Sequence, residues 1–449
     1  MSRWSAVFVA RALGRAVPGD GFTEISTDTR ALGRGALFVA LTGERFDGHD
    51  HLAAARDAGA AAAVVRRGTA AVPGLTLLEV DDPLEAYGRL GRERRREIAG
   101  PVVAVTGSNG KTSTKEMLAA VLRTRWRVHS TRLNLNNLVG VPQTILQSAP
   151  DTEALVIEAG ASEQGELARM RAIIEPSVTV ITNVHESHLD GFGSVQGILE
   201  EKLSLAAGVP LAVVGPDPAA LPEGARRLAR RVITAGLAGA ERVPDAVAVD
   251  ARGEPTFTAD GERVHLPLRG AHQAGNAMLA WTVGREHGCD PAAMARALGA
   301  LVIPGGRGEI LQQGGLTVVN DAYNANPSSF RAAIELARAM RPGRRLVFVA
   351  GTMRELGDEA ERYHREVAEA LVALAPDLLA AVGEFVPALE PWRAALGDRL
   401  LTAPDAQALG PLLAARLRGD ELVVLKASRG PALERILPYL GITSSAPSH

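Results

Sequence analysis

A glycine-rich loop between an apolar run and a helical pattern is the feature most able to do chemistry. It reads Thr106-Gly107-Ser108-Asn109-Gly110-Lys111-Thr112 and continues into Ser113. Glycines let backbone N–H groups point at phosphate oxygens, and a helix N-terminus adds about half a positive charge. Lys111 would neutralise the β- and γ-phosphates of a nucleotide, and the Thr112 hydroxyl would ligate Mg²⁺. The loop therefore predicts phosphate binding, although Val105 stands where the general loop pattern has glycine.

Lysine is so scarce in this chain that each one marks a candidate for chemistry. It occurs only at Lys111, Lys115, Lys202 and Lys426, while arginine fills every other basic position. An ammonium is a compact point charge, and its neutral amine can be modified covalently, which a guanidinium resists. A GC-rich genome would explain the scarcity, but it does not explain why Lys111 lies in a phosphate-binding loop.

Polar residues that follow predicted strands supply candidate metal ligands. Glu158 ends the apolar run 155–157, where a carboxylate suits Mg²⁺, although it could also simply cap the strand. His188 follows another strand, and His185 competes with it on spacing. Lys202 lies in a helical pattern that favours an ion-paired surface lysine. The alternative is a carbamate formed with CO₂, which would help hold a second Mg²⁺.

Side-chain amides gather at further places. Asn134-Leu135-Asn136-Asn137 can contact a sugar, an adenine or a peptide carbonyl, or can form a turn. His272 and Asn276 begin a helix, where they could contact adenine or cap the helix. Residues 321–327, which read Asp321-Ala322-Tyr323-Asn324-Ala325-Asn326-Pro327, carry more polar side chains than a turn needs.

Composition bounds the class of protein. At 449 residues, with 46% hydrophobic and 22% charged residues, the chain predicts a soluble globular protein. A net charge of −2 and the absence of a long basic run argue against nucleic acid as partner. Cys289 is the only cysteine, which excludes an intramolecular disulfide and fits a cytoplasmic protein. Neither a signal peptide nor a membrane span is predicted.

The order of predicted elements places these residues in an α/β fold. Strands near residues 36–41 and 61–65 flank a helix over 51–59, and a charged helix over 85–98 leads onward. Strands over 102–105, 155–158, 178–183 and 211–214 alternate with helices, which predicts a parallel sheet. Functional groups collect at the carboxyl ends of such strands. An antiparallel stretch over 243–268, a hinge at 304–308 and strands over 316–321, 345–350 and 421–426 follow, before a disordered tail over 444–449.

These motifs together resemble the Mur ligase family over nearly the whole chain. The resemblance implies an α/β protein of three domains. A UDP-binding α/β domain spans residues 1–97, a central parallel-sheet domain of the P-loop ATPase type spans 98–307, and a Rossmann-like ligase domain spans 308–449. The family also implies a cytoplasmic monomer without nucleic-acid or membrane partners.

The same resemblance assigns roles to individual residues. It implies contacts to ATP by residues 106–113 and by Asn276, Arg307, Asp321 and Lys426. It implies binding of two Mg²⁺ ions by Thr112, Glu158, His188 and a carbamylated Lys202. The implied catalytic residues are Lys111, Glu158, His188, Lys202 and Arg307. Lys115 receives no role.

Three segments, residues 136–142, 321–329 and 350–357, resemble the branch of the family that joins D-Ala-D-Ala to UDP-MurNAc-tripeptide. Residues 26–30 and 43–49 resemble its UDP-binding segments. The implied substrate contacts are Ser26, Thr29, Arg30, Asp47, His49, Asn136, Asn137, Tyr323 and Asn326. The chain departs from the usual family pattern at Leu138, Ser204, Gln273, Thr352 and Ala427.

The implied reaction is an ATP-dependent amide ligation through an acyl phosphate, with a hinge that closes to exclude water. Two other functions remain open at this point. One is a different amide ligase of the family, such as a tripeptide synthetase or a folylpolyglutamate synthase. The other is a regulatory protein whose ATP site acts only as a conformational switch. The third residue of the tripeptide, lysine or diaminopimelate, also stays open.

Overall fold

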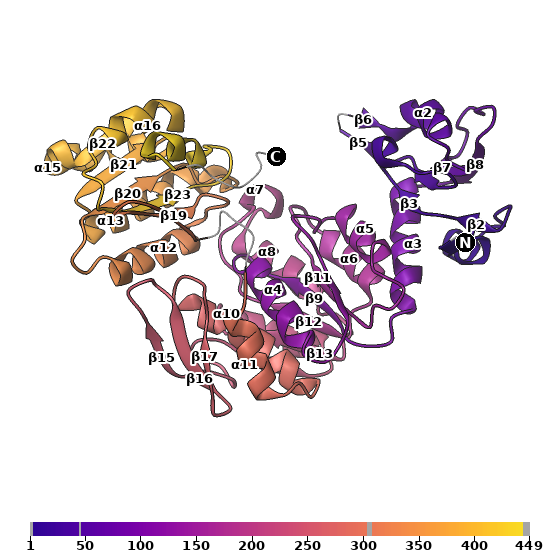
Figure 1. Cartoon of the computed structure of the whole chain (residues 1–449), viewed down its shortest axis with the longest axis horizontal. Coiled ribbons are helices and arrows are strands. Elements are labelled where there is room, and N and C mark those ends of the chain that lie inside the picture. Colours follow the sequence, from indigo (N-terminus) through magenta and orange to yellow (C-terminus); the bar gives the residue numbers. More distant parts are fainter. Residues whose placement is uncertain (1–2, 45, 303–307, 443–449) are drawn as a thin grey trace. The chain divides into compact units, whose positions relative to one another are not determined.

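The computed structural model describes residues 3–44, 46–302 and 308–442 (Figure 1). The chain forms two compact units, which are described separately below. The first consists of Met1–Thr106, Arg125–Ala161 and Gly165–Thr179, and the second of Gly107–Thr124, Ser162–Gln164 and Val180–His449. Most of the predicted hinge, at 304–307, and the predicted tail over 444–449 lie outside the described residues.

The first unit contains a parallel sheet with the strand order β3-β4-β7-β8. Its strands are short and largely apolar, as is usual where helices cover a parallel sheet. The predicted strands over 36–41 and 61–65 are confirmed as β4 and β7. The elements of this region are β1 (Trp4–Ser5), α1 (Ala6–Leu13), β2 (Gly21–Phe22), β3 (Ile25–Ser26), β4 (Leu37–Val39), β5 (Thr42–Gly43), β6 (Phe46–Asp47), α2 (Leu52–Asp57), β7 (Ala62–Arg66) and β8 (Thr76–Val80).

Helix α3 (Pro83–Arg96) is the long charged helix that the sequence predicts. Asp82 caps its N-terminus by accepting hydrogen bonds from the next turn, and Pro83 occupies a position where proline is favoured. Its buried face, which includes Tyr87 and Leu90, joins the core of the first sheet. Its arginines bind Glu175 at the end of α6 (Glu166–Ile174), so the charged face also has a packing role.

A second sheet has the strand order β10-β11-β9-β12-β13-β14. Strands β9, β11, β12 and β13 are buried along their whole length, which explains their uninterrupted apolar sequences. The predicted parallel sheet is confirmed. The bounds are β9 (Val102–Thr106), β10 (Val128–Ser130), β11 (Ala154–Glu158), β12 (Val178–Ile181), β13 (Leu211–Val214) and β14 (Val232–Thr234), with α5 (Gly140–Leu146) after β10.

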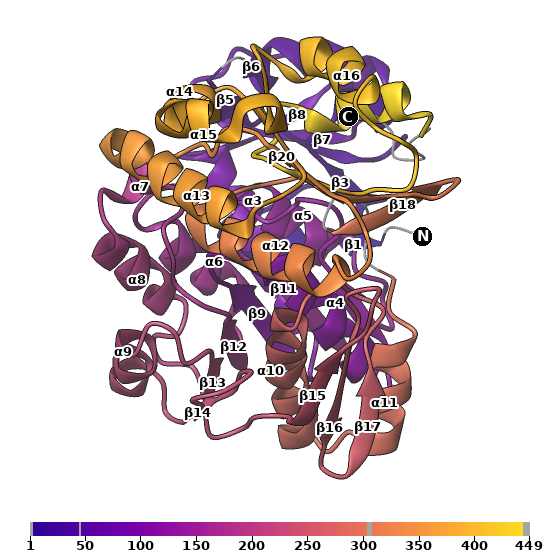
Figure 2. The ribbon, with the colours of Figure 1, turned by 90° about the vertical axis from the view of Figure 1, so that its left-hand side faces the viewer.

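In the second unit, helices α10 and α11 lie beside a three-stranded antiparallel sheet (Figure 2). This sheet confirms the antiparallel stretch predicted over 243–268. The elements are α4 (Lys111–Leu122), α7 (Leu189–Phe192), α8 (Val195–Ser204), α9 (Ala220–Leu228), β15 (Asp245–Val249), β16 (Pro255–Ala259), β17 (Glu262–His265), α10 (His272–Glu286) and α11 (Pro291–Gly299). Among the described residues, no helix is both long and apolar enough to cross a membrane.

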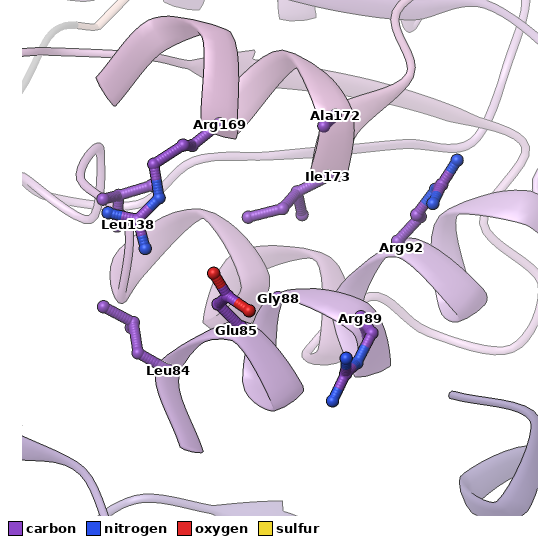
Figure 3. Close-up of a pocket in the computed structure, with 9 residues that line it drawn as sticks. All are labelled: Leu84, Glu85, Gly88, Arg89, Arg92, Leu138, Arg169, Ala172 and Ile173. Atoms are coloured by element: carbon purple, nitrogen blue, oxygen red, sulfur yellow. The ribbon is translucent and has the colours of Figure 1, made fainter. Parts of the chain in front are cut away.

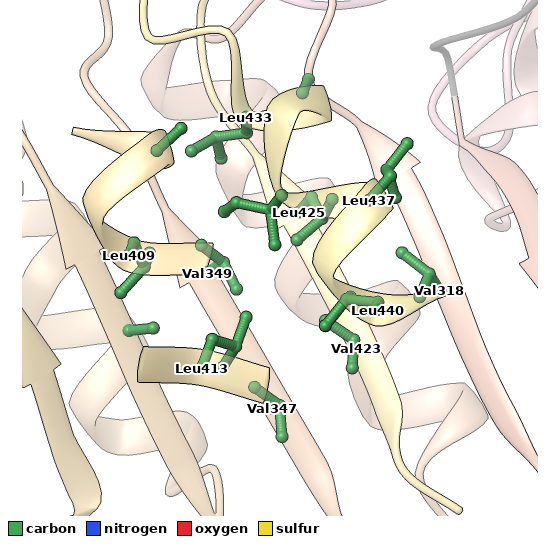
Figure 4. Close-up of a cluster of buried hydrophobic side chains, with 14 of the residues drawn as sticks. Val318, Val347, Val349, Leu409, Leu413, Val423, Leu425, Leu433, Leu437 and Leu440 are labelled. Atoms are coloured by element: carbon green, nitrogen blue, oxygen red, sulfur yellow. The ribbon is translucent and has the colours of Figure 1, made fainter. Parts of the chain in front are cut away.

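The last sheet of the second unit has the order β18-β19-β23-β20-β21-β22 and is parallel except for the edge strand β18. Figure 4 shows part of the apolar core on one face, where Leu409 and Leu413 of α16 gather with Val347 and Val349 of β20. The bounds are β18 (Glu309–Gln313), β19 (Leu316–Asp321), α12 (Pro327–Met340), β20 (Leu346–Ala350), α13 (Ala360–Leu374), β21 (Leu378–Val382), α14 (Phe385–Leu389), α15 (Arg393–Leu396), β22 (Leu400–Ala403), α16 (Ala406–Ala414) and β23 (Leu422–Lys426).

Candidate active site

Two glycines shape the loop between β9 and α4. Gly107 has a φ of 148° and Gly110 a φ of 78°, values that residues with a Cβ atom rarely adopt. A Cβ on Gly107 would collide with the Thr182 hydroxyl, and one on Gly110 would lie 2.9 Å from the Asn276 amide. Because Gly110 is the N-cap of α4, the backbone at the start of that helix remains open to a ligand.

Residues after β12 hold the loop in place, and sequence reasoning missed their role. Asn183 accepts a hydrogen bond from the Asn109 N–H at 2.9 Å, and its carbonyl accepts one from the Ser108 N–H at 3.0 Å. The Thr182 hydroxyl donates to the Asn109 carbonyl at 2.6 Å. Ser108 in turn bonds the backbone of His185. The loop is therefore fixed before any ligand binds.

Lys111 and Lys202 lie close enough to influence one another electrostatically. The Lys111 ammonium donates to the Gly107 carbonyl at 2.8 Å and therefore folds back over the loop. Lys202 lies on α8 and is only 3% exposed, so the reading of a surface lysine was wrong. Burial, together with repulsion from Lys111, lowers the pKa of Lys202 to about 7. Much of Lys202 is thus a neutral amine near neutral pH.

Glu158 is a buried carboxylate at the carboxyl end of β11. Glu158 pairs in register with Val105 of β9. The next residue, Thr106, begins the loop. Asn136 donates to the Glu158 carboxylate at 3.0 Å and so fixes its orientation. Asn137 accepts from the N–H groups of Val139 and Gly140 at the start of α5. The adjacent amides therefore have separate tasks: Asn136 positions Glu158, whereas Asn137 caps a helix.

His188 precedes α7 with a φ of 52° and pairs with the Glu355 carboxylate at 2.6 Å. The hydrogen bond from His188 keeps the pKa of Glu355 below its usual value. His185 lies 3.5 Å from Asp217, and burial lowers the pKa of His185. Both histidines therefore have acidic partners. The backbone of His185 also supports Ser108, which gives it a structural task in the loop.

Asn276 lies in α10 and is mostly buried beside Gly110. The Gln273 side chain accepts a hydrogen bond from the Asn276 amide at 3.2 Å. Gln273, a departure from the usual family residue, thus orients Asn276 toward the loop. Asn276 therefore lies against the phosphate loop. Its contact with the nucleotide stays a prediction.

Asp321 and Lys426 end the neighbouring strands β19 and β23, where they are paired in register. The buried Lys426 ammonium lies 2.8 Å from the Asp321 carboxylate and donates to the Asn324 carbonyl at 2.7 Å. The Asp321 carboxylate and the Asn324 carbonyl thus hold this lysine at the carboxyl edge of the sheet, where α/β proteins place their functional groups. Arg307 lies outside the described residues.

Asn326 caps α12 and also contacts the phosphate loop. Its side-chain oxygen accepts from the Ser329 N–H at 2.8 Å, and its amide donates to the Asn109 side chain at 2.9 Å. The nearby Tyr323 ring lies under the guanidinium of Arg429, at 5.7 Å. Asn326 therefore links the start of α12 to the phosphate loop, a contact that its sequence motif did not indicate. Tyr323 follows β19, as predicted.

The substrate contacts that the sequence predicts between residues 26 and 49 form two small hydrogen-bond networks in the first unit. Asp47 accepts from the backbone and ring of His49, with 2.6 Å to the ring nitrogen. The other ring nitrogen of His49 accepts from the Arg66 N–H at 3.0 Å. Elsewhere, the Arg30 guanidinium pairs with Asp28 at 2.7 Å and lowers the pKa of Asp28 to about 2.

Ser26 and Thr29 belong to the same segment as this pair. The Ser26 hydroxyl donates to the Asp28 carbonyl at 3.3 Å, and Thr29 begins the short turn that follows. Arg30 is largely exposed and already faces an acid. The segment thus presents an ordered cation, which suits a phosphate-bearing ligand.

The chemistry of the loop fits a nucleotide phosphate chain. Thr106 Oγ1 and Asn109 Nδ2 are buried polar atoms without a hydrogen-bond partner among the described residues. A buried polar atom of this kind costs free energy until something pairs with it. The Thr112 hydroxyl and the Glu158 carboxylate are oxygen donors of the type that Mg²⁺ prefers. Within the described ranges, however, no three His, Cys, Asp or Glu side chains gather to form a metal site unaided.

A cavity of about 210 Å³ in the first unit has none of these residues in its lining (Figure 3). It is lined by Leu84, Glu85, Gly88, Arg89 and Arg92 of α3, by Leu138, and by Arg169, Ala172 and Ile173 of α6. Figure 3 shows the Arg169 guanidinium beside Leu138. Because none of the predicted site residues lines it, the cavity does not mark the phosphate chemistry.

Three family models match successive parts of the chain, and the first two of these parts overlap. The model of the Mur ligase family catalytic domain matches residues 21–135, the Mur ligase middle domain matches 105–284, and the Mur ligase glutamate ligase domain matches 306–429. The chain belongs to the Mur ligase family, and its architecture is the three-domain arrangement of that family.

Individual relatives narrow the comparison to one branch. The UDP-N-acetylmuramoyl-tripeptide–D-alanyl-D-alanine ligase of Bacillus subtilis is 34% identical, over 93% of this chain and 92% of its own. A crystal structure of MurF from Acinetobacter baumannii superposes with a TM-score of 0.88 at 29% identity, covering 97% of this chain and 98% of the other. MurF from Thermotoga maritima, crystallised with ADP, gives 0.82 at 29% identity, with 93% and 96% covered.

Proposed function

We propose that this chain is an ATP-dependent ligase that joins D-Ala-D-Ala to UDP-MurNAc-tripeptide and forms UDP-MurNAc-pentapeptide for peptidoglycan. The observation that carries the proposal is similarity to ligases of that name over 93% of the chain. The ordered phosphate loop, and the strand ends that carry Glu158, Asp321 and Lys426, supply groups of the kind that such a reaction needs.

In the proposed reaction, an oxygen of the tripeptide carboxylate attacks the γ-phosphorus of ATP. The bond from that phosphorus to the bridging oxygen breaks, and ADP leaves. The amine of D-Ala-D-Ala then attacks the acyl carbon and loses a proton, and the carbon–oxygen bond breaks to release phosphate. Both substrates of the first step are anions, so the reaction needs cations at the point where they meet.

Residues of this chain divide that work. Lys111 and the N-terminus of α4 stabilise the negative charge of the phosphates, and Gly107 and Gly110 let the backbone approach them. Asn136 keeps the Glu158 carboxylate in one orientation. Asn276, which lies against Gly110, is proposed to contact the adenine. Asp321, Lys426 and Arg307 are proposed to complete the nucleotide site. Bound Mg²⁺, at two sites, would screen charge and stabilise the transferring phosphoryl group.

Lys202 is proposed to act as a carbamate. Its amine would attack CO₂ and release a proton, which turns a buried cation into an anionic oxygen ligand. Its burial on α8, its closeness to the Lys111 charge and its lowered pKa support this chemistry, because only a neutral amine reacts with CO₂. Thr112, Glu158, His188 and the carbamate would then hold the metal ions. To bind a metal ion, the His188 ring would give up its contact with the Glu355 carboxylate.

We propose that the UDP group is bound in the first unit by Ser26, Thr29, Arg30, Asp47 and His49. Asn137 and Tyr323 are proposed to lie near the peptide. We propose a monomer, as the family resemblance implies, and a cytoplasmic reaction that uses soluble nucleotides.

One assay tests the proposed function. The chain is mixed with ATP, Mg²⁺, UDP-MurNAc-tripeptide and D-Ala-D-Ala, and the product is identified by mass. One pentapeptide and one phosphate should form per ATP consumed. ATP binding without phosphate release would favour a regulatory protein instead. Product from single amino acids, but none from the dipeptide, would indicate another ligase of the family.

A further inference from the structure

An open, shallow cavity of about 570 Å³ in the domain of the last sheet is lined by eight residues, of which five are arginines. We call it the arginine cavity. Besides Pro342 and Gly343, its lining residues are Arg338, Arg341, Arg344, Arg345, Arg418 and Asp377. They come from the end of α12, the turn before β20 and the segments before β21 and β23. No residue of the proposed active site belongs to it.

The arginine cavity lies at the amino edge of the sheet. Arg345 directly precedes β20 and Asp377 directly precedes β21. Asp321 and Lys426, by contrast, are the last residues of β19 and β23. A strand of five residues spans roughly 16 Å, so the length of the strands separates this cavity from the edge that carries Asp321 and Lys426.

Contacts within the domain hold several of the guanidinium groups in place. Arg341 pairs with Asp377 at 3.2 Å, and Arg345 pairs with the buried Glu421 at 2.7 Å. Arg344 donates to the Thr317 hydroxyl at 2.8 Å. Each contact uses only part of a guanidinium that has five N–H donors. The groups are therefore positioned and still able to donate.

Positive charge exceeds negative charge at the cavity wall. Asp377 is the only carboxylate that lines it. Glu421 is fully buried, and it also accepts from the backbone N–H groups of Arg418 and Gly419. Arg338 pairs with Glu335 of its own helix. Among the residues that the structure describes, the Arg418 side chain has no ion-pair partner.

We propose that the arginine cavity binds a small phosphate-bearing anion. Planar guanidinium groups match the oxygens of a phosphate group in pairs. The volume lies within the range of small-molecule sites, but the wall offers no aromatic or large apolar surface for a nucleobase. The phosphate groups themselves, free or on a lipid headgroup, are therefore the part that is recognised.

Protection of individual arginines from phenylglyoxal, read by mass spectrometry, tests this site in the full chain. Inorganic pyrophosphate is added at constant ionic strength, with the nucleotide site saturated by ADP. Arg338 and Arg418 should become protected. Arg365, which is exposed on α13 and pairs with Glu361, should not. A parallel arm uses vesicles of phosphatidylglycerol and phosphatidylcholine to identify a lipid headgroup as the source of the phosphate.

A double variant, Arg338→Gln with Arg418→Gln, gives a second readout by calorimetry. Losing two charge-assisted contacts should weaken pyrophosphate or vesicle binding at least about tenfold. Arg365→Gln should leave that affinity unchanged. Both altered positions are exposed, so thermal unfolding should match the parent chain. Absence of protection by either probe, or equal weakening by Arg365→Gln, would overturn the proposal.

Discussion

At the scale of single residues, Lys202 shows how surroundings set chemistry. Its side chain is buried on α8, and its pKa of about 7 makes the amine reactive toward CO₂. Lys202→Arg keeps a cation but cannot form a carbamate. We expect kcat to fall about a hundredfold or more, since the variant would lose the proposed carbamate, a ligand for the metal beside the phosphoryl group. Nucleotide affinity should change little.

The matched control is Glu200→Gln, an exposed position on the same helix. It should keep full activity. A carbamate signal in ¹³C NMR under labelled CO₂, present in the parent chain and absent from Lys202→Arg, checks the modification directly. Parental turnover by Lys202→Arg would contradict the assigned role.

His364 makes the stability of the last domain depend on pH. Its Nε2 accepts from the Met353 N–H at 2.9 Å, and its Nδ1–H donates to the Ala360 carbonyl at 2.7 Å. Burial lowers the pKa of His364, so the folded protein favours the neutral ring. Below pH 6.5 the unfolded chain binds more protons. Stability is therefore fully present above that pH and is lost as the pH falls.

His364→Phe removes this titration and leaves the Met353 N–H unpaired. The free energy of unfolding should fall by about 2 kcal/mol at pH 7.5. The gap to the parent should then narrow as the pH falls to 5.5, because only the unfolded parent chain gains a proton on a histidine that stays neutral when folded. Urea unfolding at both pH values measures this, with the exposed His51→Gln as control. A gap that is constant with pH would contradict the account.

At the scale of elements, the loop between β9 and α4 depends on Gly107. Alanine there would combine a disfavoured φ of 148° with a collision against Thr182. We expect Gly107→Ala to weaken ATP binding at least about tenfold and to lower the unfolding temperature, because the strained backbone costs roughly 1–3 kcal/mol. Nucleotide titration and thermal unfolding measure the two effects.

Gly165→Ala is the matched control, because Gly165 also has a positive φ, of 87°, but nothing lies near its Cβ position. It should reduce stability slightly and leave nucleotide binding intact. If both variants bound ATP equally well, the close packing of Gly107 would not matter to the loop.

The sequence predicted these elements well where local signals were strong. Unbroken apolar runs located β9, β11 and β13 almost to the residue, and their ends located Glu158 and the loop. The sequence wrongly favoured a surface position for Lys202. Glu201 beside it is buried too, so charged residues of α8 do not all lie on its solvent-exposed face. The task of Asn183 was also hidden, since a turn asparagine carries no local sign of the loop it supports.

At the scale of the whole molecule, the family supplied the order of domains, whereas contacts between distant segments could not be predicted. The arginine cavity joins residues near 340, 377 and 418, which only the strand order brings together. Asn109 and Asn326 likewise meet across a long stretch of sequence. No short pattern records such pairs, because each arises from the packing of complete elements.

The central claim is that the γ-phosphoryl group of ATP is transferred to the tripeptide carboxylate before the amide forms. The most direct measurement uses UDP-MurNAc-tripeptide with ¹⁸O in its terminal carboxylate, together with ATP and D-Ala-D-Ala. The account predicts that one ¹⁸O atom appears in each phosphate released as pentapeptide accumulates. Pentapeptide formation with unlabelled phosphate would contradict it.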